Sequence, residues 1–164
     1  MIFLTIGSHE PFDRLVQSVD EWCDLSGLGS EVFGQITDHA RYRPRNFRST
    51  ARLGAAEYSR CVAQSRFLIA HVGMGSIITS LAARKPIVVL PRRGHLKETR
   101  NDHQFDSLRL VRNLKGVFAA EDELELSLQL SNVNLLTAGD YEIPEIQPYA
   151  ESELIKTLRN AIHT

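Results

Sequence analysis

The sequence predicts an α/β protein built on a single Rossmann-like, doubly wound parallel sheet. Three runs dominated by apolar residues, at 2–6, 66–71 and 87–90, are typical of strands buried on both faces, as in parallel sheets. Each run is followed by a turn and then by a segment whose apolar residues recur every three or four positions, as on one face of a helix. This alternation over 164 residues indicates one open α/β domain.

The first predicted helix begins near Pro11, a residue that suits a first helical turn, and Ser8 is a candidate to cap it. An apolar stripe runs along this helix until Gly27, which is predicted to end it. A second strand is predicted over 31–36. Residues 38–54 contain five arginines and are predicted to form a loop with one short strand.

Further along the chain, the pattern predicts in order a helix over 55–65, a helix over 76–83, a helix from 102, a strand over 117–119 and a helix from 121. Residues 131–149 contain one glycine and two prolines and are expected to be an extended tail. An amphipathic pattern predicts a closing helix over 151–162. We therefore place the sheet domain at 1–130 and assign 131–164 to a tail and helix that pack on the domain or on a partner.

Composition argues against several classes of function. The chain has 19 Lys and Arg against 20 Asp and Glu, a net charge of 19 − 20 = −1, which disfavours nucleic-acid binding driven by bulk charge. No apolar run approaches the ~20 residues that span a bilayer, and the N-terminus lacks the basic start and cleavage site of a signal peptide. Cys23 and Cys61 have no metal-ligand spacing and are expected to be buried thiols in a reducing cytosol.

Open α/β sheets bind ligands at the carboxyl ends of their strands, and two turns there are unusual. They are residues 7–9 and residues 71–76. Gly73 and Gly75 allow a ligand to approach the backbone closely, and the free amides at the start of the next helix, with Ser76, suit an anion such as a diphosphate. The same glycines also suit a plain strand-to-helix turn, so the turn alone leaves both interpretations open.

Common phosphate and metal motifs do not fit the chain. Ile78 stands where a dinucleotide fingerprint needs its third glycine, and no Gly-Lys-Ser/Thr sequence completes a Walker loop. His71, His95 and His103 come from separate loops without the spacing of paired metal ligands. We therefore predict neither a metal nor another cofactor.

A second polar cluster opens the helix predicted from residue 102. Asn101 or Asp102 suits an ordinary N-cap, whereas His103 and Gln104 are placed to hydrogen-bond a sugar. The loop before this helix is basic, and its cations either assist a diphosphate or are solvated loop charge. The candidate cations are Arg92, Arg93 and His95.

These stretches together resemble the carboxyl-terminal, donor-binding half of GT-B glycosyltransferases of the family-28 type. The resemblance is to the small catalytic subunits of split enzymes, namely the UDP-N-acetylglucosamine transferase of dolichol-linked glycan assembly and bacterial exopolysaccharide transferases. It rests on Phe3-Leu-Thr-Ile-Gly-Ser8, Pro11-Phe-Asp-Arg-Leu-Val16, His71-Val-Gly-Met-Gly-Ser76, Lys85-Pro-Ile-Val-Val-Leu90 and Asn101-Asp-His-Gln104.

The resemblance implies that residues 1–130 bind a nucleotide sugar, expected to be a UDP-sugar. Members of the family commonly carry a Glu that holds the ribose where this chain has Thr79, which leaves the ribose contact and the preference for UDP open. Because no Asp-x-Asp metal motif is present, the helix start near Gly75 is expected to stabilise the leaving diphosphate. The implied donor-binding residues are Gly7, Ser8, His71, Gly73, Met74, Gly75, Ser76, Thr79, His103 and Gln104.

A complete GT-B enzyme has two such lobes, with the reaction between them. The resemblance therefore implies a membrane-anchored, acceptor-binding subunit that recruits this chain to the cytoplasmic membrane face, and a lipid-linked acceptor in exopolysaccharide or glycolipid synthesis. The general base is expected to be His9 or a group of the partner. The arginines over 41–52 and 92–100 either face acidic lipid or are solvated. The alternative function is a non-catalytic nucleotide-sugar-binding module or regulatory scaffold.

Overall fold

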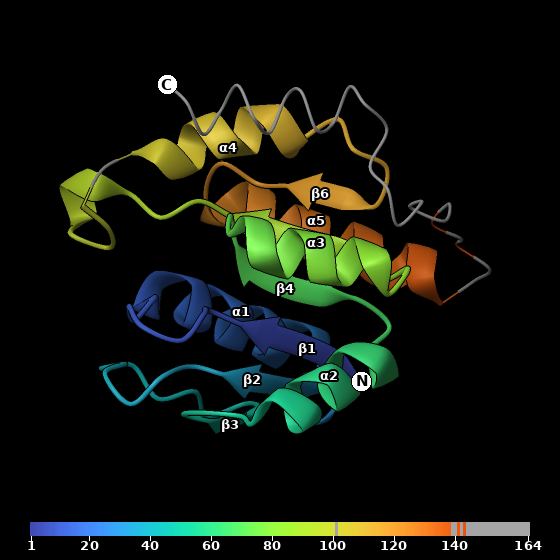
Figure 1. Ribbon diagram of the computed structural model, residues 1–164. Coiled ribbons are helices and arrows are strands. Elements are labelled where there is room, and N and C mark those ends of the chain that lie inside the picture. Colours follow the sequence, from blue (N-terminus) through green and yellow to red (C-terminus); the bar gives the residue numbers. More distant parts are fainter. Residues whose placement is uncertain (101, 139–140, 142, 144–164) are drawn as a thin grey trace.

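The computed structural model describes residues 1–100, 102–138, 141 and 143, and it contains one six-stranded sheet (Figure 1). All strand pairs are parallel, and the strand order is β3-β2-β1-β4-β5-β6. The strands are β1 (Ile2–Thr5), β2 (Val32–Gln35), β3 (Arg48–Thr50), β4 (Leu68–His71), β5 (Ile87–Leu90) and β6 (Val117–Ala119). The helices are α1 (Asp13–Ser26), α2 (Ala55–Gln64), α3 (Met74–Ala82), α4 (His103–Val111) and α5 (Glu123–Thr137). The predicted doubly wound parallel sheet is confirmed.

Helices cover both faces of the sheet (Figure 1). On one face, α1 and α5 bury their apolar stripes in a core that includes Leu15, Val19 and Leu130. On the other face, α2, α3 and α4 pack over a second core that includes Ile77 and Leu108. Because both faces are covered, β1 and β5 are buried along their whole length, as the continuous apolar runs predicted.

The strand order reverses at β1 and β4, and we call the place where the carboxyl ends of these two strands meet the crevice. From β1 the chain moves outward through β2 and β3, and it then returns to the other side of β1 to form β4. The helices that follow these two strands lie on opposite faces, because α1 belongs to one core and α3 to the other. Such a reversal separates the two strand-to-helix turns and is where open α/β sheets bind ligands.

The first helix begins later than expected and has a different cap. Phe12 is the N-cap residue and makes no side-chain capping bond, so Ser8 does not cap α1. The Ser8 hydroxyl instead lies 2.8 Å from Nδ1 of His9 in a turn that separates β1 from the helix. At the other end, Gly27 adopts a left-handed conformation with φ of 69°, which confirms it as the residue that ends α1.

The last described helix is longer than the sequence pattern indicated. The expectation that the tail is extended from residue 131 is wrong for residues 131–137, because α5 continues to Thr137 and buries Val133 completely. Leucines on the opposite face of α5 are exposed, and these two apolar faces conceal the usual helical periodicity. The closing helix predicted over 151–162 lies outside the described residues.

Both cysteines are free thiols. Cys23 is buried as expected, and burial, with a contribution from Asp20, raises the pKa of its thiol to about 12. Cys61, on α2, is only half-buried and packs against the second core. In the described part of the chain, none of the helices combines the length and the apolar character that crossing a membrane requires.

Candidate functional site

The start of α3 opens onto the crevice between β1 and β4. Gly73 is the N-cap residue, and Ile77 is the first residue of α3 whose amide donates back, to the Gly73 carbonyl. Among the described residues, no acceptor pairs with the amides of Met74, Gly75 and Ser76. A side chain at Gly75 would meet nothing within 4 Å, so this end of the helix is open to a ligand. Three free amides at a helix start are suited to an anion.

His71, the last residue of β4, occupies the space between two glycines of the crevice. A Cβ at Gly73 would lie 2.3 Å from the imidazole Nε2, and one at Gly7 would lie 3.2 Å from its Cε1. Gly7 also has a φ of +84°, which disfavours other residues. A side chain at Gly73 would therefore clash with the imidazole, whereas Gly75 has open space beside it, and the close approach of a ligand to both glycines stays a prediction.

The imidazole of His71 is neutral at physiological pH. Burial, and then the charge of the nearby Arg92 guanidinium, lower the pKa of His71 to about 4, and the backbone of Thr5 offsets part of this shift. Its Nδ1 is buried and has no hydrogen-bond partner among the described residues. Because Nδ1 is buried, the nitrogen of the neutral ring that a ligand could reach is Nε2, on the side of Gly73, which donates or accepts depending on the tautomer.

Arg92 does not face the crevice as a free cation, which corrects the sequence-based expectation. It is only 3% exposed, and among the described residues its guanidinium donates to backbone carbonyls alone. The sequence showed a basic loop but not which of its arginines would turn inward, because the acceptors belong to a turn some eighty residues earlier. The acceptors are the carbonyls of Ile6, Glu10, Pro11 and Glu98.

The remaining candidates of the β5–α4 loop lie at the same edge of the sheet but are held differently. The Gln104 side-chain oxygen accepts from the Arg92 amide at 3.0 Å, which leaves its NH₂ group as a donor. The Arg93 guanidinium donates to the Glu121 carbonyl at 3.0 Å and lies over the Phe105 ring, so it points toward the start of α5. His95 is exposed in the 3₁₀ turn Gly94–Leu96.

The start of α4 only partly follows expectation. Asp102 is the N-cap residue, but its carboxylate accepts from the Gly94 amide at 2.7 Å and makes no capping bond. His103 is largely exposed, and its Nδ1 lies 4.0 Å from the Asp106 carboxylate. Asn101 lies outside the described residues.

The other predicted residues stand at or beside the crevice without contacts that fix a role. Ser8 and His9 are exposed on the turn after β1, and Thr79 is exposed on α3. Met74 and Ser76 are half-buried in the first turn of α3. In the described part of the chain, no three His, Cys, Asp or Glu side chains gather as a metal site would require.

Known protein structures share the fold of this chain, although its sequence matches neither a family model nor a curated protein. The glycosyltransferase of kitacinnamycin matches with a TM-score of 0.60 and 19% identity, over 99% of this chain and 39% of that one. ALG13 matches with a TM-score of 0.58 and 18% identity, over 96% of this chain and 93% of that one, and the calicheamicin glycosyltransferase CalG4 with a TM-score of 0.55 and 14% identity, over 99% of this chain and 38% of that one.

The chain has the fold of the carboxyl-terminal half of a GT-B glycosyltransferase. It spans about two-fifths of the length of the kitacinnamycin and calicheamicin proteins but nearly all of ALG13. The fold that the sequence motifs indicated is thereby confirmed. At identities below 20%, the comparisons establish the architecture, and the donor-binding roles assigned from the sequence stay predictions.

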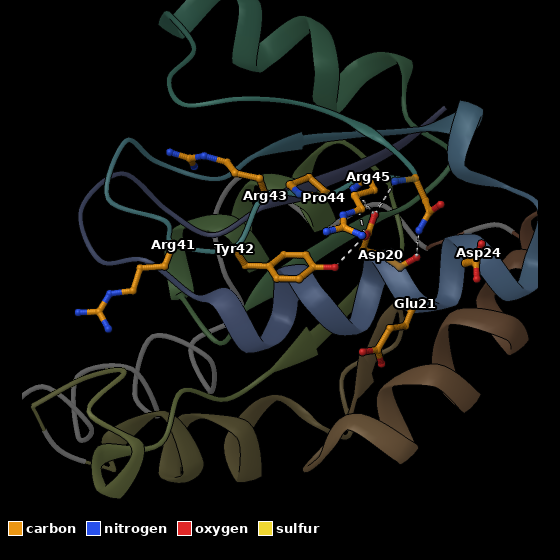
Figure 2. Close-up of a pocket in the computed structure, with 9 residues that line it drawn as sticks. Asp20, Glu21, Asp24, Arg41, Tyr42, Arg43, Pro44 and Arg45 are labelled. Atoms are coloured by element: carbon orange, nitrogen blue, oxygen red, sulfur yellow. Dashed lines mark hydrogen bonds between the residues drawn. The ribbon is translucent and has the colours of Figure 1, made fainter.

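This GT-B half also has a hollow of about 680 Å³ away from the crevice, between α1 and residues 41–46 (Figure 2). Its floor is Asp20, which is 2% exposed and accepts from the Tyr42 hydroxyl and the Asn46 amide, each at 2.8 Å. Arg41 and Arg43 point away from α1 (Figure 2). Because Asp20 already binds the loop, we interpret this hollow as a structural contact. The sequence analysis did not single out Asp20, although a carboxylate before an arginine-rich loop is a possible signal.

Proposed function

We propose that the chain is the donor-binding, catalytic subunit of a two-component glycosyltransferase. It moves a sugar from a UDP-sugar to a lipid-linked acceptor in exopolysaccharide or glycolipid synthesis. The observation that carries this proposal is the open start of α3, where the unpaired amides of Met74, Gly75 and Ser76 adjoin the crevice between β1 and β4. The GT-B half-fold supports a nucleotide-sugar ligand over other anions.

In the proposed reaction, the bond between the anomeric carbon and the diphosphate oxygen breaks, and negative charge grows on the diphosphate. The amides at the start of α3 and the helix dipole stabilise that charge. His71, neutral and beside Gly73, donates a further hydrogen bond to the diphosphate. The acceptor hydroxyl attacks the anomeric carbon and gives its proton to a base, which is His9 on the turn after β1 or a group of the partner.

The proposed partner is a membrane-anchored subunit that binds the acceptor. The chain matches about two-fifths of the kitacinnamycin and calicheamicin proteins, and the resemblance to GT-B enzymes implies a second lobe that would supply the facing wall of the reaction cleft. The sequence resemblance to split transferases supports a partner that brings this chain to the cytoplasmic membrane face. The acceptor, a lipid-linked sugar, would then lie between the two subunits.

Substitution of Gly75 tests the donor site. The glycine is exposed and has open space beside it, so Gly75→Trp should fold normally, yet its indole would cover the three free amides. We expect Gly75→Trp to weaken UDP binding by on the order of a hundredfold or more, and Gly75→Ala to weaken it far less, in isothermal titration calorimetry. Equal UDP affinity of all three proteins would refute the diphosphate site.

A transfer assay tests the reaction. The chain is co-expressed with a candidate small membrane protein encoded beside it, and membranes are supplied with labelled UDP-sugars. We expect labelled lipid only when both proteins are present, and none with Gly75→Trp. If the chain binds UDP but the pair transfers no sugar from any UDP-sugar, the non-catalytic binding module becomes the better interpretation.

A further inference from the structure

Two arginines connect the turn between β1 and α1 with the loop after β5. One arginine lies on each side, and its guanidinium donates to backbone carbonyls on the other side. Arg92, after β5, donates to the carbonyls of Ile6 and Glu10, both at 2.8 Å, and to Pro11. Arg14, on α1, reaches in the opposite direction and donates to the Pro91 carbonyl at 2.7 Å. We call Arg14 and Arg92 the arginine pair.

The arginine pair is assembled around one aromatic ring and one carboxylate. The Phe12 ring is fully buried, and the guanidinium carbons of Arg92 and Arg14 lie 4.6 and 5.2 Å from its centroid. The Glu98 carboxylate accepts two bonds from Arg14, at 2.8 and 2.9 Å. Within the described residues, no carboxylate lies within hydrogen-bond distance of the Arg92 guanidinium, and the partners of its guanidinium there are carbonyls. The hydrogen bonds of Arg92 therefore hold the backbone of the residues whose carbonyls accept them.

The turn after β1 depends on Arg92 for its backbone hydrogen bonds. In the described part of the chain, the amides and carbonyls of residues 7–9 make no hydrogen bond. The turn is bounded by Ile6 and by Glu10 with Pro11, and all three carbonyls accept from Arg92. The same turn carries Gly7, where a Cβ would lie 3.2 Å from Cε1 of the His71 imidazole.

We propose that Arg92 is a positioning residue of the donor site, which fixes the turn over 7–11 against the start of α3 and does not itself contact the ligand. This inference rests on the proposed function for the identity of the ligand, a nucleoside diphosphate. The planar fork of arginine reaches several carbonyls at once, whereas the ammonium of lysine is a single point on a flexible stem. A lysine at position 92 keeps the charge and loses most of this bridging.

The test compares Arg92→Lys with a matched control, Arg66→Lys. Arg66 is less buried than Arg92 and pairs with Glu31 at 2.7 Å, but it precedes β4 at the amino ends of the strands. Backbone ¹⁵N relaxation of residues 7–10 is measured without ligand, and UDP affinity is measured by calorimetry. We expect Arg92→Lys to make the turn more mobile and to weaken UDP binding by about tenfold, and Arg66→Lys to change neither.

Each other outcome has a defined meaning. A turn as rigid as in the wild type with unchanged UDP affinity overturns the proposal. Weaker UDP binding with a rigid turn also overturns it, because it indicates direct contact between Arg92 and the ligand. A mobile turn with wild-type affinity overturns it as well. If the wild-type chain binds no UDP, the proposed function fails, and the relaxation data still show whether Arg92 holds the turn.

A second variant keeps the proposal testable if Arg92→Lys does not fold. Phe12→Leu removes the aromatic face beneath Arg92 but keeps an apolar side chain at a fully buried position. We expect Phe12→Leu, like Arg92→Lys, to make the turn more mobile and to weaken UDP binding, but by smaller amounts. Unchanged mobility of residues 7–10 together with unchanged UDP affinity in Phe12→Leu contradicts the proposal.

Discussion

His71 stays uncharged in the folded protein because burial and the neighbouring Arg92 guanidinium lower its pKa to about 4. In the unfolded chain a histidine titrates near pH 6.5. Between these two values the unfolded state binds the additional proton, so the folded state loses stability as the pH falls. The contribution of neutral His71 to the free energy of unfolding is complete above about pH 6.5 and declines as the pH falls to about 4.

Acidification should therefore destabilise the protein through His71. We expect the free energy of unfolding to fall by on the order of 3 kcal/mol more in the wild type than in His71→Asn between pH 7 and pH 4. Urea unfolding at several pH values measures this difference. Parallel pH profiles of the two proteins would show that the imidazole is not held neutral.

Asp20, on α1, has a structural role in holding the loop over residues 42–46. The carboxylate is buried and accepts from the backbone amides of Arg45 and Asn46 and from the Tyr42 hydroxyl. It therefore satisfies donors of a loop that has little regular structure of its own. Asp13, seven residues earlier on the same helix, does the same for the amides of Arg41 and Tyr42.

Replacing the buried carboxylate should be costly, whereas replacing its exposed neighbour should not. We expect Asp20→Asn to lower the free energy of unfolding by about 2–3 kcal/mol, because an amide NH₂ would face donors where the carboxylate now accepts. The control, Asp24→Asn, lines the same hollow but is exposed, and it should change stability by less than about 0.5 kcal/mol. Equal effects in denaturant unfolding would contradict this assignment.

At the scale of elements, the pattern of apolar residues predicted helices that bury one stripe and strands that are buried on both faces. The runs that became β1 and β5 were found because their residues are apolar throughout. The end of α5 was not found, since Leu130 and Val133 face the core while Leu128 and Leu135 face solvent. A helix with apolar residues on two sides gives no single stripe, and only the packed sheet distinguishes the sides.

The continuation of α5 into the core makes a direct prediction. Val133 is fully buried and Leu135 is 74% exposed, so the smaller side chain should matter more. We expect Val133→Ala to cost about 2 kcal/mol of unfolding free energy and Leu135→Ala less than about 0.5 kcal/mol. Thermal or denaturant unfolding of both variants measures this. A larger loss for Leu135→Ala would contradict this orientation of α5, and no loss for either variant would indicate that residues 131–137 do not belong to the folded domain.

At the scale of the whole molecule, the sequence predicted the sheet and the strand-to-helix turns at the carboxyl ends of its strands, but not how distant loops meet there. Glycines and a helix start marked the turn over 71–76 because those features are local. The inward course of Arg92 depends on carbonyls of the β1–α1 turn, which local sequence cannot reveal. The sequence also did not predict that the imidazole of His71, two residues before Gly73, fills the space beside that glycine, because this depends on the backbone path of the turn.

The central claim is that the start of α3, beside the turn after β1, binds the diphosphate of a UDP-sugar. The most direct test is a titration of the ¹⁵N-labelled chain with UDP, followed by amide chemical shifts. The account predicts saturable shifts concentrated at Gly7, Ser8 and residues 73–76. Shifts confined to the hollow between α1 and residues 41–46, or no saturable shift at all, would contradict it.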